Sequence, residues 1–387
     1  MIERIAEPVL KTLAKQFRAV ALVGPRQSGK STLAKAAFPG KAYVSLENPE
    51  IKQRAIDDPK GFLSQYHQGA IFDEVQRVPE LFNYLQQILD ESDERGKFIL
   101  SGSNNFLMLE KITQSLAGRI GYLDLLPFSY PEILRINNYP KEINDLLFRG
   151  GYPAVAYEGV DAKFWFPAYV RTYVERDVRQ IKNISDLTTF QRFMFLCAGR
   201  IGQQLNLSSL AIECGIDHKT AQSWLSVMQA SYIVHLLQPY HKNYSKRVIK
   251  SPKLYFYDTG LACYLLALES ANNLVNHTMR GALFENFIVN ELLKMRLNEG
   301  LRSNLFYWRD VSGHELDLII DKNPEPVAIE IKSGMTLNTE YFKNLYFWNK
   351  LNPESQKILI YGGDESFRYN DMCEVVSWRT LSTLSTV

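Results

Sequence analysis

The 387-residue sequence has few cysteines, little net charge and no long apolar run. Its four cysteines are far apart and form no C-x-x-C pair, which argues against zinc ribbons and a disulfide framework and fits a reducing cytoplasm. A formal net charge of +2 restricts any nucleic-acid surface to a local patch. The N-terminus is acidic where a signal peptide needs an apolar core, and no apolar window of about 18 residues predicts a membrane span. These absences predict a cytoplasmic protein without membrane segments, and the length allows two or three domains.

The strongest motif is a glycine-containing loop between a predicted strand and a predicted helix. Residues 24–31 match G-x-x-x-x-G-K-[ST], the apolar run 19–23 precedes them, and a helical run follows. In such a loop the backbone N–H groups and the helix N-terminus hold phosphates. Lys30 would contact the β- and γ-phosphates, and the Ser31 hydroxyl would ligate Mg²⁺. The predicted ligands are ATP and Mg²⁺, bound by Gly24, Pro25, Arg26, Gln27, Ser28, Gly29, Lys30, Ser31 and Thr32.

Polar residues end the next predicted strands. Asp73 and Glu74 end the strand at residues 69–76; Asp73 would hold Mg²⁺ in its outer coordination sphere, and Glu74 would orient or deprotonate the attacking water. After the strand that begins at residue 97, Asn104 or Ser103 would sense the γ-phosphate, unless this segment is a plain turn. Arg119 would neutralise transition-state charge in its own subunit or in a neighbour's, or else is a surface arginine. The predicted catalytic set here is Lys30, Glu74, Asn104 and Arg119.

The middle of the chain has helix-turn-helix spacing. A helix at 207–213 and a tight turn precede a second helix, 218–229, that has Lys219, Gln222 and Ser223 away from its apolar face. Strands at 232–237 and 253–257 then flank a basic loop, which is the pattern of a winged helix. The wing would suit phosphate contact, although winged helices also serve as protein-contact modules. Its basic residues are Lys242, Lys246, Arg247, Lys250 and Lys253.

The C-terminal third contains an acidic and basic pattern on predicted strands. Glu315 and Asp317 alternate to one side of a strand, and Glu330 and Lys332 do so on the next strand. Asp317 followed by Glu330-x-Lys332 is the PD-(D/E)xK nuclease arrangement, with Leu316 where a proline is usual. Two such carboxylates can hold Mg²⁺, and Lys332 would neutralise charge on a phosphate. Glu285, on the preceding apolar helix, would complete the metal site, so that the predicted ligands here are Glu285, Asp317 and Glu330.

The motifs together resemble the prokaryotic AAA-family ATPases that have a C-terminal nuclease-like domain of unknown function. The resemblance covers nearly the whole chain and implies AAA+ architecture and a homo-oligomer, with a hexamer as one form. The segments that carry it are residues 24–32, 71–76, 100–103, 115–119, 148–153 and 173–178.

The sequence therefore predicts an α/β fold in four parts. These are a P-loop AAA+ domain with a parallel sheet at 1–130, a helical linker region at 131–186, a winged helix-turn-helix domain at 187–258 and a PD-(D/E)xK restriction-nuclease-like α/β domain at 259–387. One hypothesis is Mg²⁺-dependent ATP hydrolysis coupled to binding of nucleic acid, DNA rather than RNA, with metal-dependent cleavage by the C-terminal domain. The alternative is an ATP-gated switch or scaffold whose inactive nuclease-like domain binds protein partners.

Overall fold

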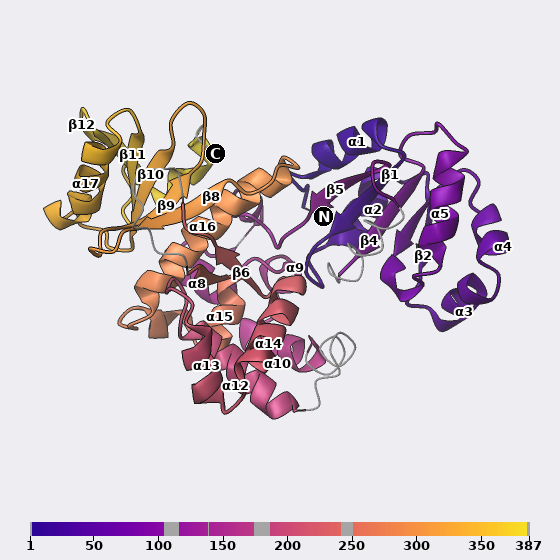
Figure 1. Ribbon diagram of the computed structural model, residues 1–387, viewed down its shortest axis with the longest axis horizontal. Helices are drawn as coiled ribbons and strands as arrows, with labels where there is room; N and C mark the ends of the chain where they lie inside the picture. Colours follow the sequence, from indigo (N-terminus) through magenta and orange to yellow (C-terminus); the bar gives the residue numbers. More distant parts are fainter. Residues whose placement is uncertain (1, 104–115, 138, 174–185, 241–250, 385–387) are drawn as a thin grey trace. The chain divides into compact units, whose positions relative to one another are not determined.

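The computed structural model describes residues 2–103, 116–137, 139–173, 186–240 and 251–384 (Figure 1). Its internal contacts divide the chain into two compact units. Unit 1 consists of residues 1–136, 230–232 and 297–301, and unit 2 consists of residues 137–229, 233–296 and 302–387. The boundaries predicted after residues 186 and 258 both fall inside unit 2, which therefore contains the helix-turn-helix segment and the C-terminal sheet together.

Unit 1 is built on a five-stranded sheet in the order β2-β3-β4-β1-β5, in which every pair of neighbours is parallel. This confirms the predicted N-terminal parallel sheet. Its elements are α1 (Glu7–Gln16), β1 (Ala19–Val23), α2 (Lys30–Ala37), β2 (Ala42–Ser45), α3 (Pro49–Asp57), α4 (Pro59–Ser64), β3 (Ala70–Asp73), the 3₁₀ helix η1 (Val75–Arg77), α5 (Leu81–Asp90), β4 (Phe98–Gly102), β5 (Ile120–Asp124) and α7 (Tyr130–Ile133).

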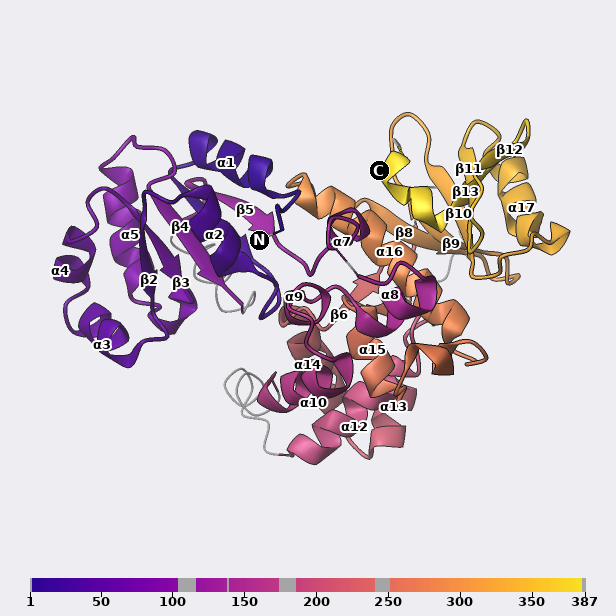
Figure 2. The ribbon, with the colours of Figure 1, turned by 180° about the vertical axis from the view of Figure 1, so that it is seen from behind.

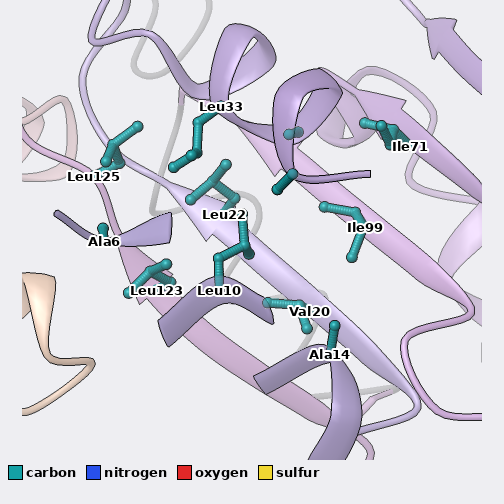
Figure 3. Close-up of a cluster of buried hydrophobic side chains, with 12 residues drawn as sticks. Ala6, Leu10, Ala14, Val20, Leu22, Leu33, Ile71, Ile99, Leu123 and Leu125 are labelled. Carbon is teal, nitrogen blue, oxygen red and sulfur yellow. The ribbon is translucent and has the colours of Figure 1, made fainter. Parts of the chain in front are cut away.

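Helices cover both faces of this sheet because alternate strand residues point to opposite sides. Figure 3 shows Leu10 of α1 and Leu33 of α2 against Val20 and Leu22 of β1 on one face. On the other face, Phe62 of α4 packs on Phe72 of β3, with ring centroids 6.1 Å apart. Parallel strands all end at the same edge of the sheet, so the loop after β1 and the carboxylates after β3 are brought together there.

Unit 2 has a helical part with a short hairpin. The turn between α13 and α14 contains Gly215 at φ 74°, and Phe190 of α12 packs on Trp224 of α14. The strands β6 and β7 pair antiparallel after α14. The elements are α8 (Ile143–Arg149), α9 (Pro153–Ala156), α10 (Ala162–Tyr173), α12 (Leu187–Ala198), α13 (Leu207–Cys214), α14 (His218–Ala230), β6 (Val234–Leu237), β7 (Lys253–Phe256), α15 (Thr259–Leu265) and η3 (Ala271–Leu274).

The rest of unit 2 is a six-stranded mixed sheet in the order β12-β13-β11-β10-β9-β8. Helix α17 covers one face of this sheet (Figure 2). Its Trp348 is fully buried and belongs to the same core cluster as Leu316, Ala328 and Leu359. The elements are α16 (Arg280–Asn298), β8 (Leu305–Arg309), β9 (Glu315–Ile320), β10 (Val327–Lys332), η4 (Thr339–Phe342), α17 (Lys343–Leu351), β11 (Gln356–Tyr361), β12 (Phe367–Asn370), β13 (Cys373–Ser377) and η5 (Trp378–Thr383). Within the described ranges, no helix is both long and apolar enough to span a bilayer.

Candidate functional site

The loop between β1 and α2 has the backbone that its sequence pattern requires. Gly24 and Gly29 have φ angles of 148° and 94°, which glycine adopts freely, and Gln27 also has a positive φ of 59°. A Cβ atom on Gly24 would lie 2.2 Å from the carbonyl oxygen of Leu125, so only glycine fits there. The loop therefore curls tightly in front of the N-terminus of α2, whose first N–H groups have no partner within the helix. Such N–H groups bind anions.

Lys30, the first residue of α2, folds back onto this loop. Its Nζ donates to the carbonyl oxygens of Gly24 at 3.0 Å and Pro25 at 2.6 Å, and the residue is only 5% exposed. Ser28 is fully buried, and its Oγ has no hydrogen-bond partner among the described residues. A charged ammonium and an unused hydroxyl thus lie in the same loop, which fits a phosphate-binding loop.

Three hydroxyl groups surround the carboxylate of Asp73 at the end of β3. Asp73 Oδ2 accepts from Ser31 Oγ at 2.9 Å and from the Tyr43 hydroxyl at 2.6 Å, and Asp73 Oδ1 accepts from Ser101 Oγ. Burial and the hydrogen bond to Asp73 raise the pKa of Tyr43 to about 12, so this hydroxyl remains a donor at neutral pH. All three of these donors are neutral hydroxyl groups. Hydroxyl and carboxylate oxygens of this kind are ligands that Mg²⁺ accepts together with substrate phosphates, so Ser31 and Asp73 fit the predicted Mg²⁺ site.

Glu74 is held in an unfavourable backbone conformation next to Asp73. Its φ of 54° and ψ of 43° lie in the left-handed region, which costs a non-glycine residue about 1–3 kcal/mol. Its Oε2 accepts from Gln76 Nε2 at 2.6 Å and from Ser103 Oγ at 3.1 Å. The carboxylate is therefore fixed at the ends of β3 and β4. Ser103 lies at this position as expected for a polar strand end, whereas Asn104 lies outside the described residues.

Arg4 and Glu132 form a buried ion pair that also contacts the phosphate loop. No pattern in the sequence predicted this pair. Arg4 is 6% exposed; its Nε donates to Glu132 Oε1 at 2.9 Å, its Nη1 to the carbonyl oxygen of Ser28 at 2.8 Å, and its Nη2 to that of Leu126 at 2.7 Å. Glu132 is fully buried and also accepts from the backbone N–H and the hydroxyl of Ser129. Arg4 thereby joins the N-terminal segment, the phosphate loop and the segment after β5.

Arg119 lies at the end of the sheet where the strands begin, opposite the end that carries the phosphate loop. It precedes Ile120, which pairs with Ala19 at the start of β1, whereas the phosphate loop follows the end of β1. Its Nη2 donates to Asp90 Oδ2 at 3.0 Å, and its Nε also donates to Asp90. The expected role in its own subunit is therefore wrong, because a strand's length separates the guanidinium from the loop. The role in a neighbouring subunit stays a prediction.

In unit 2 the structure brings together Asp317, Glu330 and Lys332, as the strand pattern predicted. Lys332 Nζ lies 2.6 Å from Glu330 Oε1 and 3.4 Å from Asp317 Oδ2, and the Ile331 N–H donates to Asp317 Oδ2 at 2.8 Å. Burial and the neighbouring Asp317 charge raise the pKa of Glu330 to about 8. Burial alone would lower the pKa of Lys332, but Asp317 and Glu330 raise it above its ordinary value.

A divalent cation at this position would have the carboxylates of Asp317 and Glu330 as its protein ligands. Among the described residues, no group of three or more His, Cys, Asp or Glu side chains could hold a metal ion. Mg²⁺, however, is commonly held by one or two carboxylates with waters and phosphates. Glu330 is 4% exposed, and its Oε2 has no hydrogen-bond partner among the described residues. Asp317 and Glu330 therefore fit as a two-carboxylate site.

Glu285, the third predicted metal ligand, is engaged elsewhere. Its Oε1 accepts from the Tyr255 hydroxyl and lies 3.3 Å from Lys253 Nζ. Lys253 is 2% exposed and also lies 2.7 Å from Glu315 Oε1. The expectation that Lys253 contacts phosphate as part of the wing is therefore wrong, because α16 and β9 bury it among carboxylates. The other four basic residues of the predicted wing lie outside the described residues.

The second helix of the predicted helix-turn-helix, α14, has a polar outer face. Ala221, Leu225 and Met228 are buried, as expected, while Lys219 and Gln222 are exposed. The described hairpin strands β6 and β7 follow this helix, so the order of elements agrees with the predicted winged helix. Nucleic-acid binding by this face of α14 stays a prediction.

Three family models match successive parts of the chain. The first is described as an AAA domain and matches residues 16–134. The second and third are domains of unknown function, DUF8612 at residues 140–272 and DUF4143 at residues 280–381. The fold of unit 1, its loop and its paired carboxylates agree with the first of these. The chain therefore carries a P-loop ATPase domain of the AAA type.

Curated relatives define the family of the whole chain. The uncharacterised protein Rv2008c of Mycobacterium tuberculosis is 30% identical over 324 residues, which cover 82% of this chain and 70% of that protein. Mb2031c of Mycobacterium bovis has the same values, and MJ1544 of Methanocaldococcus jannaschii is 22% identical over 315 residues, 74% of this chain and 67% of that protein. The chain belongs to the family of these uncharacterised mycobacterial proteins.

Solved structures with some likeness to the chain differ from it considerably. A Walker-type ATPase of Pyrococcus abyssi is 14% identical with a TM-score of 0.47, covering 68% of this chain and 96% of that one. A DNA replication initiation factor is 16% identical with a TM-score of 0.30, covering 58% and 86%. At these TM-scores the likenesses add nothing to the assignment.

Proposed function

We propose that unit 1 hydrolyses ATP in the presence of Mg²⁺, and that this reaction controls a nucleic-acid-directed activity of unit 2. The observation that carries the first part is the contact between the loop and the end of β3. Ser31, the last residue of the loop motif, donates to Asp73, and Glu74 is fixed beside it by Gln76 and Ser103. An ATP-hydrolysing site needs these groups at one edge of a sheet: phosphate donors, a metal-binding pair and a base.

Each residue has a defined task in this proposal. The loop N–H groups and Lys30 bind and orient the phosphates, with Lys30 Nζ exchanging its two carbonyl partners for phosphate oxygens. Ser31 and Asp73 would hold Mg²⁺, which when bound supplies positive charge to the phosphate oxygens. Glu74 orients the attacking water and accepts its proton. Arg119, in a homo-oligomer, would supply positive charge to the site of a neighbouring subunit, after leaving Asp90.

The ATPase proposal is tested by phosphate release from purified full-length variants. Glu74→Gln keeps the size and the hydrogen bonds of the side chain but removes the base, so turnover should fall by about 10²- to 10⁴-fold while ATP affinity is kept. Glu80→Gln, an exposed glutamate at the start of α5, is the matched control and should turn over normally. Wild-type turnover by Glu74→Gln would rule out Glu74 as the base.

For unit 2, we propose DNA binding by α14 and its hairpin and metal-dependent phosphodiester cleavage at Asp317 and Glu330. Support comes from the buried Glu330 Oε2, an acceptor without a partner among the described residues, and from Lys332 within 3.4 Å of both carboxylates. Asp317 and Glu330 would hold Mg²⁺, and Lys332 would stabilise the negative charge on the phosphate oxygens. Lys219 and Gln222 supply exposed donors on α14.

Labelled single- and double-stranded DNA and RNA, incubated with Mg²⁺ or EDTA and with or without ATP, test this second proposal. Cleavage should disappear in Asp317→Asn and persist in Lys30→Ala. Absence of binding to every nucleic acid at low salt would contradict it.

The alternative function is an ATP-gated switch whose C-terminal domain binds proteins without cleaving nucleic acid. One observation favours it. Glu315 is already paired with Lys253, and Glu330 is already paired with Lys332. A folded wild-type protein that binds no divalent cation at Asp317 and cleaves no substrate would support this alternative. Mass measurement with and without ATP would test the oligomer, and a strict monomer in both conditions would remove the role of Arg119 in a neighbouring subunit.

A further inference from the structure

Three buried side-chain atoms of unit 1 have no hydrogen-bond partner among the described residues, and all three lie in segments that follow the ends of strands. They are Ser28 Oγ in the phosphate loop after β1, and Gln76 Oε1 and Arg77 Nε in the 3₁₀ helix η1 after β3. A buried polar atom without a partner is unfavourable, and native proteins keep few of them. Two short segments at one edge of the sheet therefore have donors and acceptors left for a ligand.

Arg77 is held by Glu47, a residue of the segment that follows β2. Its Nη2 donates to Glu47 Oε1 at 3.0 Å, and the same oxygen lies 3.9 Å from Nη1 of Arg26. Two guanidinium groups from different segments thus converge on one carboxylate oxygen. Because Arg26 belongs to the phosphate loop, this convergence places Arg77 beside that loop.

The place of Arg77 in the chain also sets it next to the proposed base. Arg77 follows Glu74 by three residues, and its backbone N–H donates to the Glu74 carbonyl oxygen at 3.0 Å. The base acts on the water that attacks the γ-phosphorus, so a residue beside the base lies near the γ-phosphate. The backbone N–H groups of a phosphate loop, by contrast, mainly hold the phosphates closer to the nucleoside. Arg77 is therefore suited to contact the phosphate that ATP has and ADP lacks.

We propose that Arg77 binds the γ-phosphate of ATP in its own subunit and thereby makes the chain prefer ATP to ADP. The γ-phosphate takes the place of Glu47 at the guanidinium, and the unused Nε supplies one further donor. Glu47 then competes with the γ-phosphate and lowers the affinity for ATP. This inference rests on the proposed ATP binding by unit 1 and adds a specificity-determining residue outside the loop motif.

The experiment measures how a non-hydrolysable ATP analogue and ADP, each with Mg²⁺, displace labelled ADP from full-length variants. Arg77→Met should weaken binding of the ATP analogue at least about tenfold and binding of ADP by less than about twofold, because one charge-assisted contact is lost only with the former. Arg77→Lys keeps the charge without the planar fork and should lose less. Arg54→Met, which removes an exposed arginine of α3 that donates to Gln65, is the matched control and should bind both nucleotides normally.

Glu47→Gln is an independent arm, since the Glu47 side chain is 39% exposed and its replacement leaves the buried core unchanged. Without the competing charge, affinity for the ATP analogue should rise about two- to fivefold while ADP affinity stays constant. The gain should disappear when Arg77→Met is added, because the two residues act on the same contact.

Equal losses of ATP-analogue and ADP affinity in Arg77→Met would overturn the proposal, as would unchanged affinity for both. A missing gain in Glu47→Gln, or a gain that persists without Arg77, would also contradict it. If Arg77→Met is unfolded by circular dichroism, Arg77→Lys and Glu47→Gln decide the matter by the same criteria. A wild type that binds neither nucleotide would contradict the proposed function of unit 1 itself, whereas a wild type that binds both equally would contradict only the role of Arg77.

Discussion

Asp73 in unit 1 and Asp317 in unit 2 have different kinds of neighbouring donor. Around Asp73 the donors are the hydroxyls of Ser31, Tyr43 and Ser101, all of them neutral. Asp317 has two ammonium groups nearby, that of Lys332 at 3.4 Å and that of Lys253 at 4.0 Å. Neutral donors leave a carboxylate its charge, so it can still attract a cation, whereas lysines compensate that charge. In the proposed function, the first site accepts a metal-bound nucleotide, whereas the carboxylate of the second site has two lysines of the same chain within 4.0 Å.

The largest expected effect concerns Arg4, a buried residue whose guanidinium donates to the Ser28 carbonyl oxygen of the phosphate loop. Arg4→Met should lower the free energy of unfolding by about 3–5 kcal/mol, because Glu132 would remain buried without its counter-charge. Urea unfolding would measure this loss. Glu132→Gln in the same chain should recover part of it. Arg135→Met, which removes an exposed contact to the Glu3 carbonyl, is the control and should change stability by less than about 1 kcal/mol.

Next in size is the effect of Lys30 on nucleotide binding. Lys30→Ala should weaken ATP affinity by about 100-fold, because a charge-assisted contact with phosphate is worth about 1.5–3 kcal/mol. Lys35→Ala, on the same helix but with its ammonium over the Tyr43 ring, should bind ATP nearly normally. Fluorescence titration with a labelled ATP analogue would measure both. Equal losses in the two variants would show that general charge, rather than the loop, holds the nucleotide.

The raised pKa of Glu330 predicts that the free energy of unfolding depends on pH. The folded chain keeps the Glu330 proton up to about pH 8, whereas an unfolded glutamate loses it near its ordinary pKa of 4.5. The folded state therefore binds more protons between these values, and the free energy of unfolding should fall as pH rises through this window. Relative to Glu330→Gln, the wild type should lose up to about 2 kcal/mol between about pH 6 and pH 8. Glu340→Gln, an exposed control, should keep the wild-type slope.

The smallest effect is expected at Tyr43. Because its hydroxyl competes with a cation for Asp73 Oδ2, Tyr43→Phe should tighten the apparent affinity of the ATP complex for Mn²⁺ by about fivefold, or about 1 kcal/mol. Tyr84→Phe, a half-exposed residue of α5, is the matched control and should have no effect. Weaker Mn²⁺ binding in Tyr43→Phe would mean that the hydroxyl positions Asp73 and does not compete with the cation.

Local patterns in the sequence predicted the parts of the sites that short segments form. The phosphate loop, the Asp73–Glu74 pair at a strand end and the alternating Glu330 and Lys332 all depend on residues a few positions apart. The structure places each of them as these patterns required. Local geometry is fixed by backbone periodicity, so such motifs are visible without the fold.

Arg4 was missed and Lys253 was assigned the wrong partners, because the partners of both residues are distant in the sequence. Arg4 binds Glu132, and Lys253 binds acids on α16 and β9; neither partner can be inferred from neighbouring residues. The basic composition around Lys253 even favoured the wrong environment. For Arg119 the sequence left three roles open: its own subunit, a neighbouring subunit, or the surface. The start of a parallel strand lies at the end opposite the loop, which excludes the first of these.

The central claim, that Asp73 rather than Asp317 receives the cation that accompanies ATP, can be tested directly. Mn²⁺ affinity should be measured by electron paramagnetic resonance with and without a non-hydrolysable ATP analogue, in wild type, Asp73→Asn and Asp317→Asn. The analogue should raise Mn²⁺ affinity at least about tenfold in wild type and Asp317→Asn, and not in Asp73→Asn. An undiminished increase in Asp73→Asn, or its loss in Asp317→Asn, would contradict the account.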